Sequence, residues 1–153
     1  MLREMAPPSA GPSDDLRVRL EALGRELGRR EAAEAAALAD AWRHAEAVRA
    51  RVADALGGLH DGLAAAGASH LRLQLGPLRL DEKHVRAVQF EVARGRTQLL
   101  VTVKSRGEVV LVGPFRTGKE EGPCQRVPWD DQDALSKALL ERLAKLAEEA
   151  LAP

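Results

Sequence analysis

The sequence contains little of several residue types that common functions require. Among its 153 residues there is one cysteine, Cys124, so no disulfide can form within the chain. Tyrosine is absent and the aromatic residues are two Trp and two Phe, which disfavours a sheet that stacks bases on aromatic rings. No apolar run has the ~20 residues that a membrane-spanning helix needs. We therefore expect a cytoplasmic protein without a membrane partner.

The charges are balanced, with 23 basic and 23 acidic residues. The overall charge therefore attracts neither nucleic acid nor an anionic surface. None of the four histidines lies at a spacing typical of zinc ligands, such as H-x-x-x-H. The sequence accordingly predicts no metal and no cofactor.

One segment has the outline of a nucleotide-binding motif. Residues 113–119, GPFRTGK, follow an apolar run and match G-x-x-x-x-G-K. A phosphate-binding P-loop continues with Ser or Thr, whose hydroxyl binds Mg²⁺, and then opens a helix. Here Glu120 and Glu121 take those places, and Gly122-Pro123 follows, so a helix that starts there cannot run on. We interpret the segment as a surface loop.

The N-terminal third of the chain is predicted to be helical. Residues 1–13 form a tail rich in Pro, Ala and Ser that we expect to be disordered. Residues 14–66 then carry apolar side chains at intervals of three and four, which is typical of an amphipathic helix. Ser13 or Asp14 is the expected N-cap, and Gly57-Gly58 is a candidate break. We call this predicted element the helical arm.

From residue 67 to 153 the pattern changes to an α+β domain. Alternating apolar residues predict four antiparallel strands joined by short glycine-containing turns, within residues 70–80, 84–93, 97–104 and 108–113. After a loop over 114–128, Asp130 or Asp131 is expected to cap a last helix, which covers the apolar face of the sheet. The predicted fold class is therefore α+β.

The helical arm leads to the main functional prediction. A helix with an apolar stripe must cover it with another helix, from its own chain or from a second one. We therefore predict a non-enzymatic interaction or assembly module, which dimerises with itself or docks on a partner protein. The predicted contact residues are Leu16, Leu20, Leu23, Leu27, Leu38, Trp42, Val52 and Leu56.

The loop over 114–128 is a second candidate surface, because long loops in compact domains are often functional. Its candidate residues are Arg116, Lys119, Cys124 and Arg126. Cys124 also leaves open a thiol-dependent enzyme or redox protein, although no histidine is near it in the sequence.

The other alternative is nucleic-acid binding by the sheet. Residues 70–119 carry ten basic and four acidic residues, whereas residues 120–153 carry four basic and eight acidic ones. The basic sheet residues that could contact phosphates are Arg94, Arg96, Lys104 and Arg106. Neutralisation of the sheet by the acidic C-terminal segment is the competing explanation.

Overall fold

The chain consists of two units, which contain residues 1–36 and 37–153. The computed structural model describes residues 11–81, 86–118 and 122–151. Most of the predicted disordered tail, residues 1–10, lies outside the described residues. A single helix, α1, spans Pro12–Ala65 and contributes residues to both units.

The start of α1 corrects the predicted N-cap. The helix begins at Pro12, and the backbone N–H of Asp15 donates to the carbonyl of Gly11 at 3.0 Å. Proline suits the first helical position, because its fixed φ matches the helix and its missing N–H has no partner there in any case. Asp14 and Asp15 lie in the first turn, where the helix dipole favours negative charge.

The predicted break at Gly57-Gly58 is wrong, because α1 runs through it without interruption. Each glycine costs an interior helical position about 1 kcal/mol relative to alanine. On either side, however, Leu56 is buried and Leu59 packs against the core. Burial of these leucines outweighs the weak local propensity.

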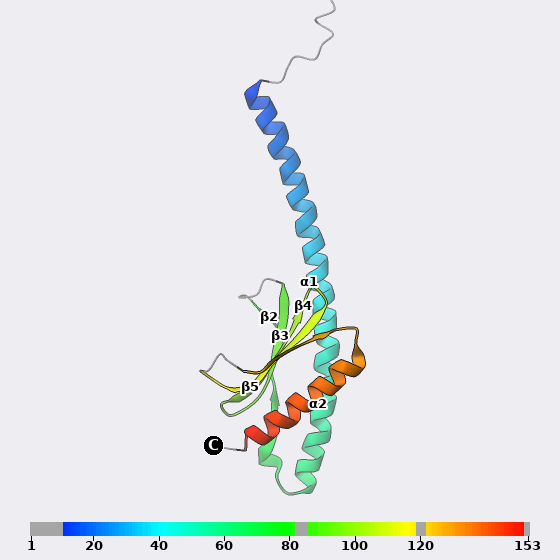
Figure 1. Cartoon of the computed structure of the whole chain (residues 1–153), viewed down its shortest axis with the longest axis vertical. Helices are drawn as coiled ribbons and strands as arrows, with labels where there is room; N and C mark the ends of the chain where they lie inside the picture. The colour runs from blue at the N-terminus through cyan, green and yellow to red at the C-terminus, as the bar shows by residue number, and fades with distance from the viewer. Residues whose placement is uncertain (1–10, 82–85, 119–121, 152–153) are drawn as a thin grey trace, which may run out of the picture. The chain divides into compact units, whose positions relative to one another are not determined.

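The predicted α+β fold is confirmed, with more strands than expected. After a short 3-10 turn, η2 at Ser69–Leu71, the strands are β1 (Gln74–Leu75), β2 (Arg79–Asp81), β3 (Ala87–Arg94), β4 (Thr97–Lys104), β5 (Glu108–Arg116) and β6 (Cys124–Pro128). The last element is α2, Gln132–Glu149. The sheet has the order β1-β3-β4-β5-β6, and β2 also pairs with β3. Figure 1 labels both helices and strands β2 to β5. All described strand pairs are antiparallel.

Two strand predictions need correction. The first predicted strand, within residues 70–80, is two short strands separated by Gly76-Pro77, because proline has no N–H for the ladder. The predicted loop over 114–128 instead contains the end of β5 and the whole of β6. In β6, Val127 pairs with Val109 and is buried, which anchors the strand to the core.

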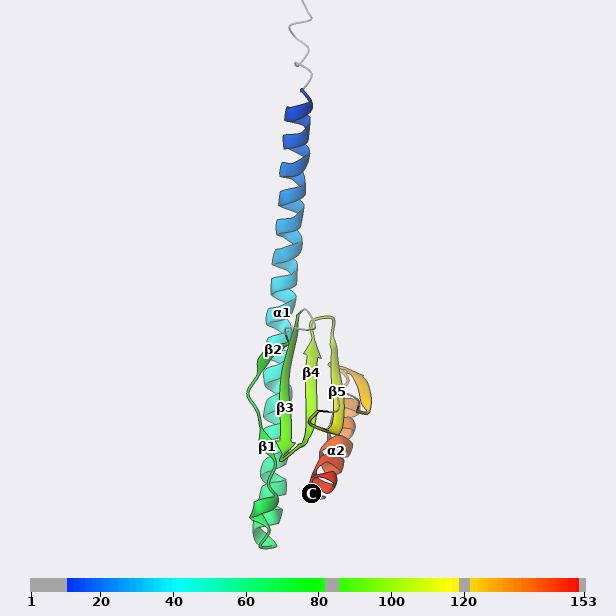
Figure 2. The same cartoon turned by 90° about the vertical axis from the view of Figure 1, so that its left-hand side faces the viewer.

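Both helices of the second unit lie on the same face of the sheet. Figure 2 shows α1 and α2 behind the strands, with α1 behind one edge of the sheet and α2 behind the other. The sheet contributes alternate residues of β3, β4 and β5, such as Phe90, Val101 and Leu111, all of which are fully buried. The side chains of α1 that complete this core are Ala41, Ala45, Val48, Val52 and Leu56. Those of α2 are Leu135, Ala138, Leu139 and Leu146.

Polar contacts fix the helices to the sheet at defined points. On α1, the Nε of Arg49 donates to the carbonyl of Gly76 at 2.9 Å. The ring of His44 stacks on Trp129 with centroids 3.9 Å apart. On α2, Arg142 donates to the carbonyl of Gly113 at 3.0 Å and to the Gln125 side chain at 3.3 Å. Residues 37–65 of α1 thus belong to the core structure of the second unit.

Leucine-to-alanine substitutions can test which part of α1 is packed in the core. Leu56 is 4% exposed and Leu23 is 49% exposed. We expect Leu56→Ala to lower the free energy of unfolding by about 2–5 kcal/mol, because it leaves a cavity. Leu23→Ala should change it by less than about 0.5 kcal/mol. Urea denaturation at low protein concentration measures both, and equal losses would contradict this boundary of the core.

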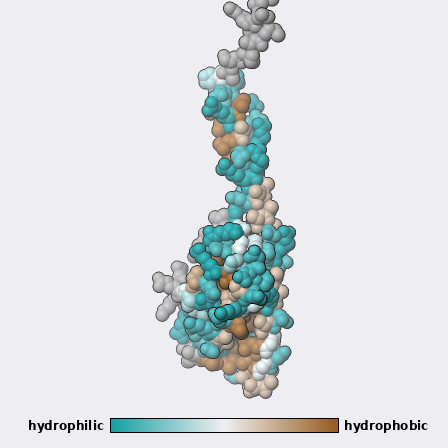
Figure 3. Space-filling view, turned by 45° about the vertical axis from the view of Figure 1, so that its right-hand side comes forward, coloured by the Kyte–Doolittle hydropathy of each residue, from teal (hydrophilic) through white to brown (hydrophobic). Residues whose placement is uncertain are grey.

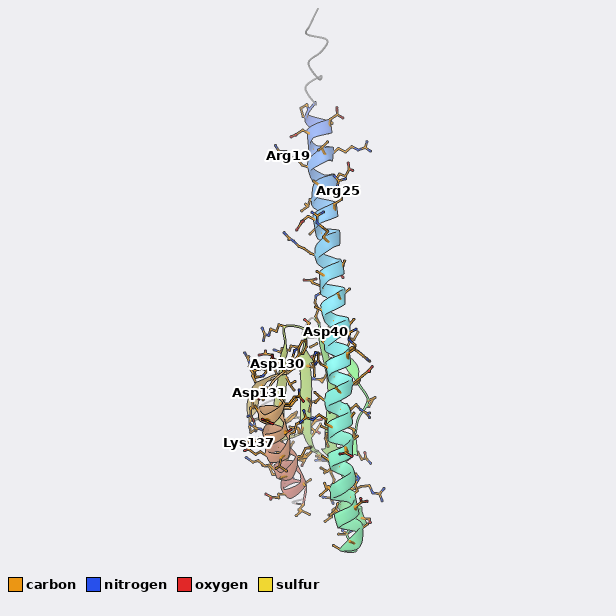
Figure 4. All side chains as sticks on the ribbon, turned by 90° about the vertical axis from the view of Figure 1, so that its right-hand side faces the viewer. Arg19, Arg25, Asp40, Asp130, Asp131 and Lys137 are labelled. Carbon is orange, nitrogen blue, oxygen red and sulfur yellow. The ribbon has the colours of Figure 1, made fainter. Side chains whose placement is uncertain are left out.

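Of the two predicted caps of the last helix, Asp130 and Asp131, both labelled in Figure 4, the cap is Asp131, whose side chain accepts from the N–H of Ala134 at 3.1 Å. We expect Asp131→Ala to destabilise the protein by about 1 kcal/mol, because this N–H loses its acceptor. The neighbouring Asp130→Ala is the matched control and should have no more than about half that effect. The same urea denaturation decides between the two aspartates.

Candidate interaction surface

Four leucines of the first unit form a row of exposed large apolar side chains on α1. Their exposed fractions are 58% for Leu16, 57% for Leu20, 49% for Leu23 and 50% for Leu27. We call these four residues the leucine face. Within the first unit the described residues form only the helix, so this unit supplies no second element to cover them. Figure 3 shows apolar surface on this part of α1 between polar side chains.

The spacing of the leucine face gives it a defined geometry. Steps of four, three and four residues keep the side chains on one side of the helix over about 17 Å. This is the spacing by which two helices interlock in a coiled coil. Val18, which is 60% exposed, lies outside this spacing. The leucine face is therefore a narrow seam of four leucines, and Val18 is a separate exposed apolar residue.

Charged residues occupy much of the rest of the helix surface around this seam. Within the helix, Arg19 pairs with Asp15 and Arg25 pairs with Glu21, each at 3.1 Å. Glu26 contacts both Arg29 and Arg30, the latter at 3.3 Å. Figure 4 labels Arg19 and Arg25 on α1. All these side chains are largely in solvent, where each pair contributes about 0.3–0.5 kcal/mol to the helix. They leave the four leucines as a continuous apolar row on one side of the helix.

The other residues predicted for the helical arm lie in the second unit. Val52 is fully buried and Leu56 almost so, because both pack in the core against the sheet and α2. Leu38 and Trp42 pack against that core and are partly buried. The predicted contact residues therefore fall into two groups. The four leucines of the first unit are exposed, and the other four residues are buried or partly buried in the second unit.

The four basic residues proposed for nucleic-acid contacts are not brought together. Arg94 and Arg96 lie at the turn between β3 and β4, where Arg94 donates to the carbonyl of Ala150 at the end of α2. Lys104 and Arg106 lie at the turn between β4 and β5, at the opposite end of these strands. There both contact Glu108, with Arg106 at 2.7 Å. The basic charge thus forms two clusters, each with an acceptor from the chain itself.

The candidate loop residues occupy two strands. Arg116 ends β5, while Cys124 and Arg126 lie on β6 beside Val112 and Val110 of β5, respectively. Lys119 lies outside the described residues. Cys124 is exposed, and the segment that resembled a P-loop leads from β5 into a turn, with β6 as the next described element.

Sequence reasoning missed an apolar groove between the two helices of the second unit. The groove has a volume of about 440 Å³ and lies between residues 51–59 of α1 and 136–147 of α2. Leu59, Leu140 and Leu143 line it, and Leu140 is 70% exposed. At one end Arg51 donates to Gln132 at 2.6 Å and also contacts Ser136. Leu140 was the available signal, since it lies beside the predicted stripe of the last helix without belonging to it.

The described residues contain no group of three or more His, Cys, Asp or Glu side chains that could hold a metal ion. Two histidines have structural contacts instead. The Nε2 of His60 accepts from the N–H of Leu73 at 3.1 Å, and His44 stacks on Trp129. In the parts of the chain that the structure describes, neither α1 nor α2 combines the length and apolar character that crossing a bilayer requires.

No family model, curated protein or solved structure matches this chain. Its function must therefore be inferred from the surfaces of the molecule.

Two glycines lie within or next to the leucine face. A Cβ added at Gly24 or Gly28 would meet no atom within 4 Å. We expect each glycine-to-alanine change to strengthen this part of α1 by about 1 kcal/mol. Hydrogen exchange of the amides in residues 20–30 should slow accordingly. Gly67→Ala is the control, because its φ of +71° strains alanine, and this variant should be destabilised.

Proposed function

We propose that this chain is a non-enzymatic protein–protein interaction module that binds a partner helix through the leucine face. The observation that supports it best is the exposure of four leucines at coiled-coil spacing on one helix. Single exposed leucines are ordinary, whereas a contiguous row of them is typical of a binding surface. The charged residues beside the row keep the free helix in solution.

Estimated energies indicate a reversible contact. Completing the burial of one half-exposed leucine yields roughly 1 kcal/mol. Four leucines meeting four equivalent side chains then yield roughly 8 kcal/mol, and association costs at least about 4 kcal/mol of this. The surplus of at most about 4 kcal/mol makes the proposed contact weak, with a dissociation constant of roughly 1 mM or above. This strength suits a regulated assembly or one that gains affinity from several copies.

The second unit has a separate part in this proposal. Its core fixes residues 37–65 of α1, and a helix that is already started extends more readily than one that must nucleate. The described contacts of residues 37–65 thus favour helix in residues 12–36 without a core in the first unit.

The test is the double substitution Leu20→Glu/Leu23→Glu, with Val18→Glu as the matched control. Both variants place charge on exposed apolar positions of the same helical segment, and only the first lies on the leucine face. We expect cross-linking in cells of the native host to capture partners, including other copies of this chain. Capture should fall at least about ten-fold for the double variant, because charged groups are costly to bury.

Val18→Glu should leave capture unchanged. Circular dichroism should show the same helix content in both variants, so that a loss of capture reflects the surface. Equal capture by the double variant and the native chain would contradict the proposed function.

A further inference from the structure

We propose that the partner of the leucine face is a second copy of this chain, bound with its helix antiparallel. The inference rests on the proposed function, since it names what that surface binds. The charged residues beside the seam support it, because their positions have different consequences for the two possible directions of a helix pair.

The leucine face is nearly symmetric about its midpoint. If two copies cross in opposite directions, Leu16 meets Leu27 of the second copy, and Leu20 meets Leu23 of the second copy. Every leucine then has a leucine opposite it, so one two-fold axis completes all four layers of the seam. The next layer on either side places Ser13 against Arg30, which leaves the guanidinium free to reach solvent.

Arg19 and Glu26 decide the direction. Arg19 directly precedes Leu20, and Glu26 directly precedes Leu27, so both lie on the same flank of the seam. In the antiparallel pair these flanks face each other, and Arg19 lies beside Glu26 of the second copy. The two-fold axis repeats the contact, which gives two opposite-charge pairs in each dimer.

A parallel pair has the opposite electrostatics. The flank of Glu26 then faces Glu31 of the second copy, five residues further along, and the two carboxylates repel. The continuing seam would also place Arg30 against Arg30 and Glu34 against Glu34 of the second copy. These like-charge contacts disfavour the parallel dimer. The same residues produce none of these contacts in the antiparallel arrangement.

Reversing single charges separates the two directions. We expect Arg19→Glu and Glu26→Arg each to weaken self-association of the full chain about ten-fold at low salt, because each turns two attractive contacts into repulsive ones. In a parallel dimer Glu26→Arg would instead strengthen association, since the new guanidinium would meet Glu31 of the second copy. Sedimentation equilibrium from the micromolar to the millimolar range, with reductant present because Cys124 is exposed, measures the dissociation constants.

The decisive variant combines both changes. Arg19→Glu/Glu26→Arg restores opposite charges across an antiparallel seam, so the affinity should return to within about three-fold of the native value. Within one helix the same double change is unfavourable, since it sets a carboxylate near Asp15 and a guanidinium near those of Arg29 and Arg30. Recovery therefore cannot come from a more stable helix. Arg25→Glu, which loses the pair with Glu21 and lies away from the seam, is the control for the effect of helix stability, and it should lower the affinity by no more than about three-fold.

Three results would overturn the inference. These are a monomeric native chain at every concentration, a tighter dimer for Glu26→Arg, and a double variant as weak as the singles. A monomeric native chain whose capture of another protein still requires Leu20 and Leu23 would leave the proposed function standing and exclude only self-association. Loss of both self-association and leucine-dependent capture would remove the two together.

Discussion

The second unit depends on covering one apolar sheet face with two helices. An antiparallel sheet of this size has one face that must be shielded from water. Residues of α1 and α2 provide that cover, and Val52 and Leu135 reach the same buried cluster from the two helices. Neither helix could be lost without exposing Phe90, Val101 and their neighbours. The packing of the helices on the sheet is mainly apolar, and the hydrogen bonds of Arg49 and Arg142 fix each helix to particular backbone carbonyls.

The two parts of α1 use apolar residues in opposite ways. In the second unit small residues are buried, and Ala41 and Ala45 are both fully covered. Alanines at these positions allow the helix backbone to approach its neighbours closely, at little cost in side-chain entropy. In the first unit the larger leucines are half exposed. Their spacing and the charges of Arg19 and Glu26 beside them suit the proposed contact with a second helix.

The sequence predicts which segments of this protein are helices and strands better than it predicts which of them pack or pair with each other. Periodicity identifies α1, the central strands and α2, because each has a clear apolar side. Asp131 is predictable as a cap because carboxylates accept from helix N-termini. Strand β6 escapes prediction because it has one buried apolar residue, Val127, among polar and proline residues. The strand forms through hydrogen bonds to β5, and the local sequence pattern of β6 does not indicate this pairing.

The candidate surface was predictable only in part, because it too depends on contacts between segments that are distant in the sequence. Periodicity places Leu20 and Val52 on apolar stripes of one helix, but it cannot tell which stripe the chain itself covers. Three-dimensional packing decides this, because the sheet covers Val52 and leaves Leu20 exposed. The groove beside Leu140 also depends on packing, since it forms between helices that are distant in sequence.

In the proposed association, helix stability and binding are coupled in the first unit. Gly24 and Gly28 weaken the helix at the leucine face by about 1 kcal/mol each. The ion pairs of Arg19, Arg25 and Glu26 stabilise the helix, but by less than the two glycines destabilise it. The helix there is therefore marginal by itself, and any partner that buries the leucines also stabilises the backbone that presents them. Binding and helix formation then reinforce each other, and affinity depends on residues such as Gly24 as well as on the leucines.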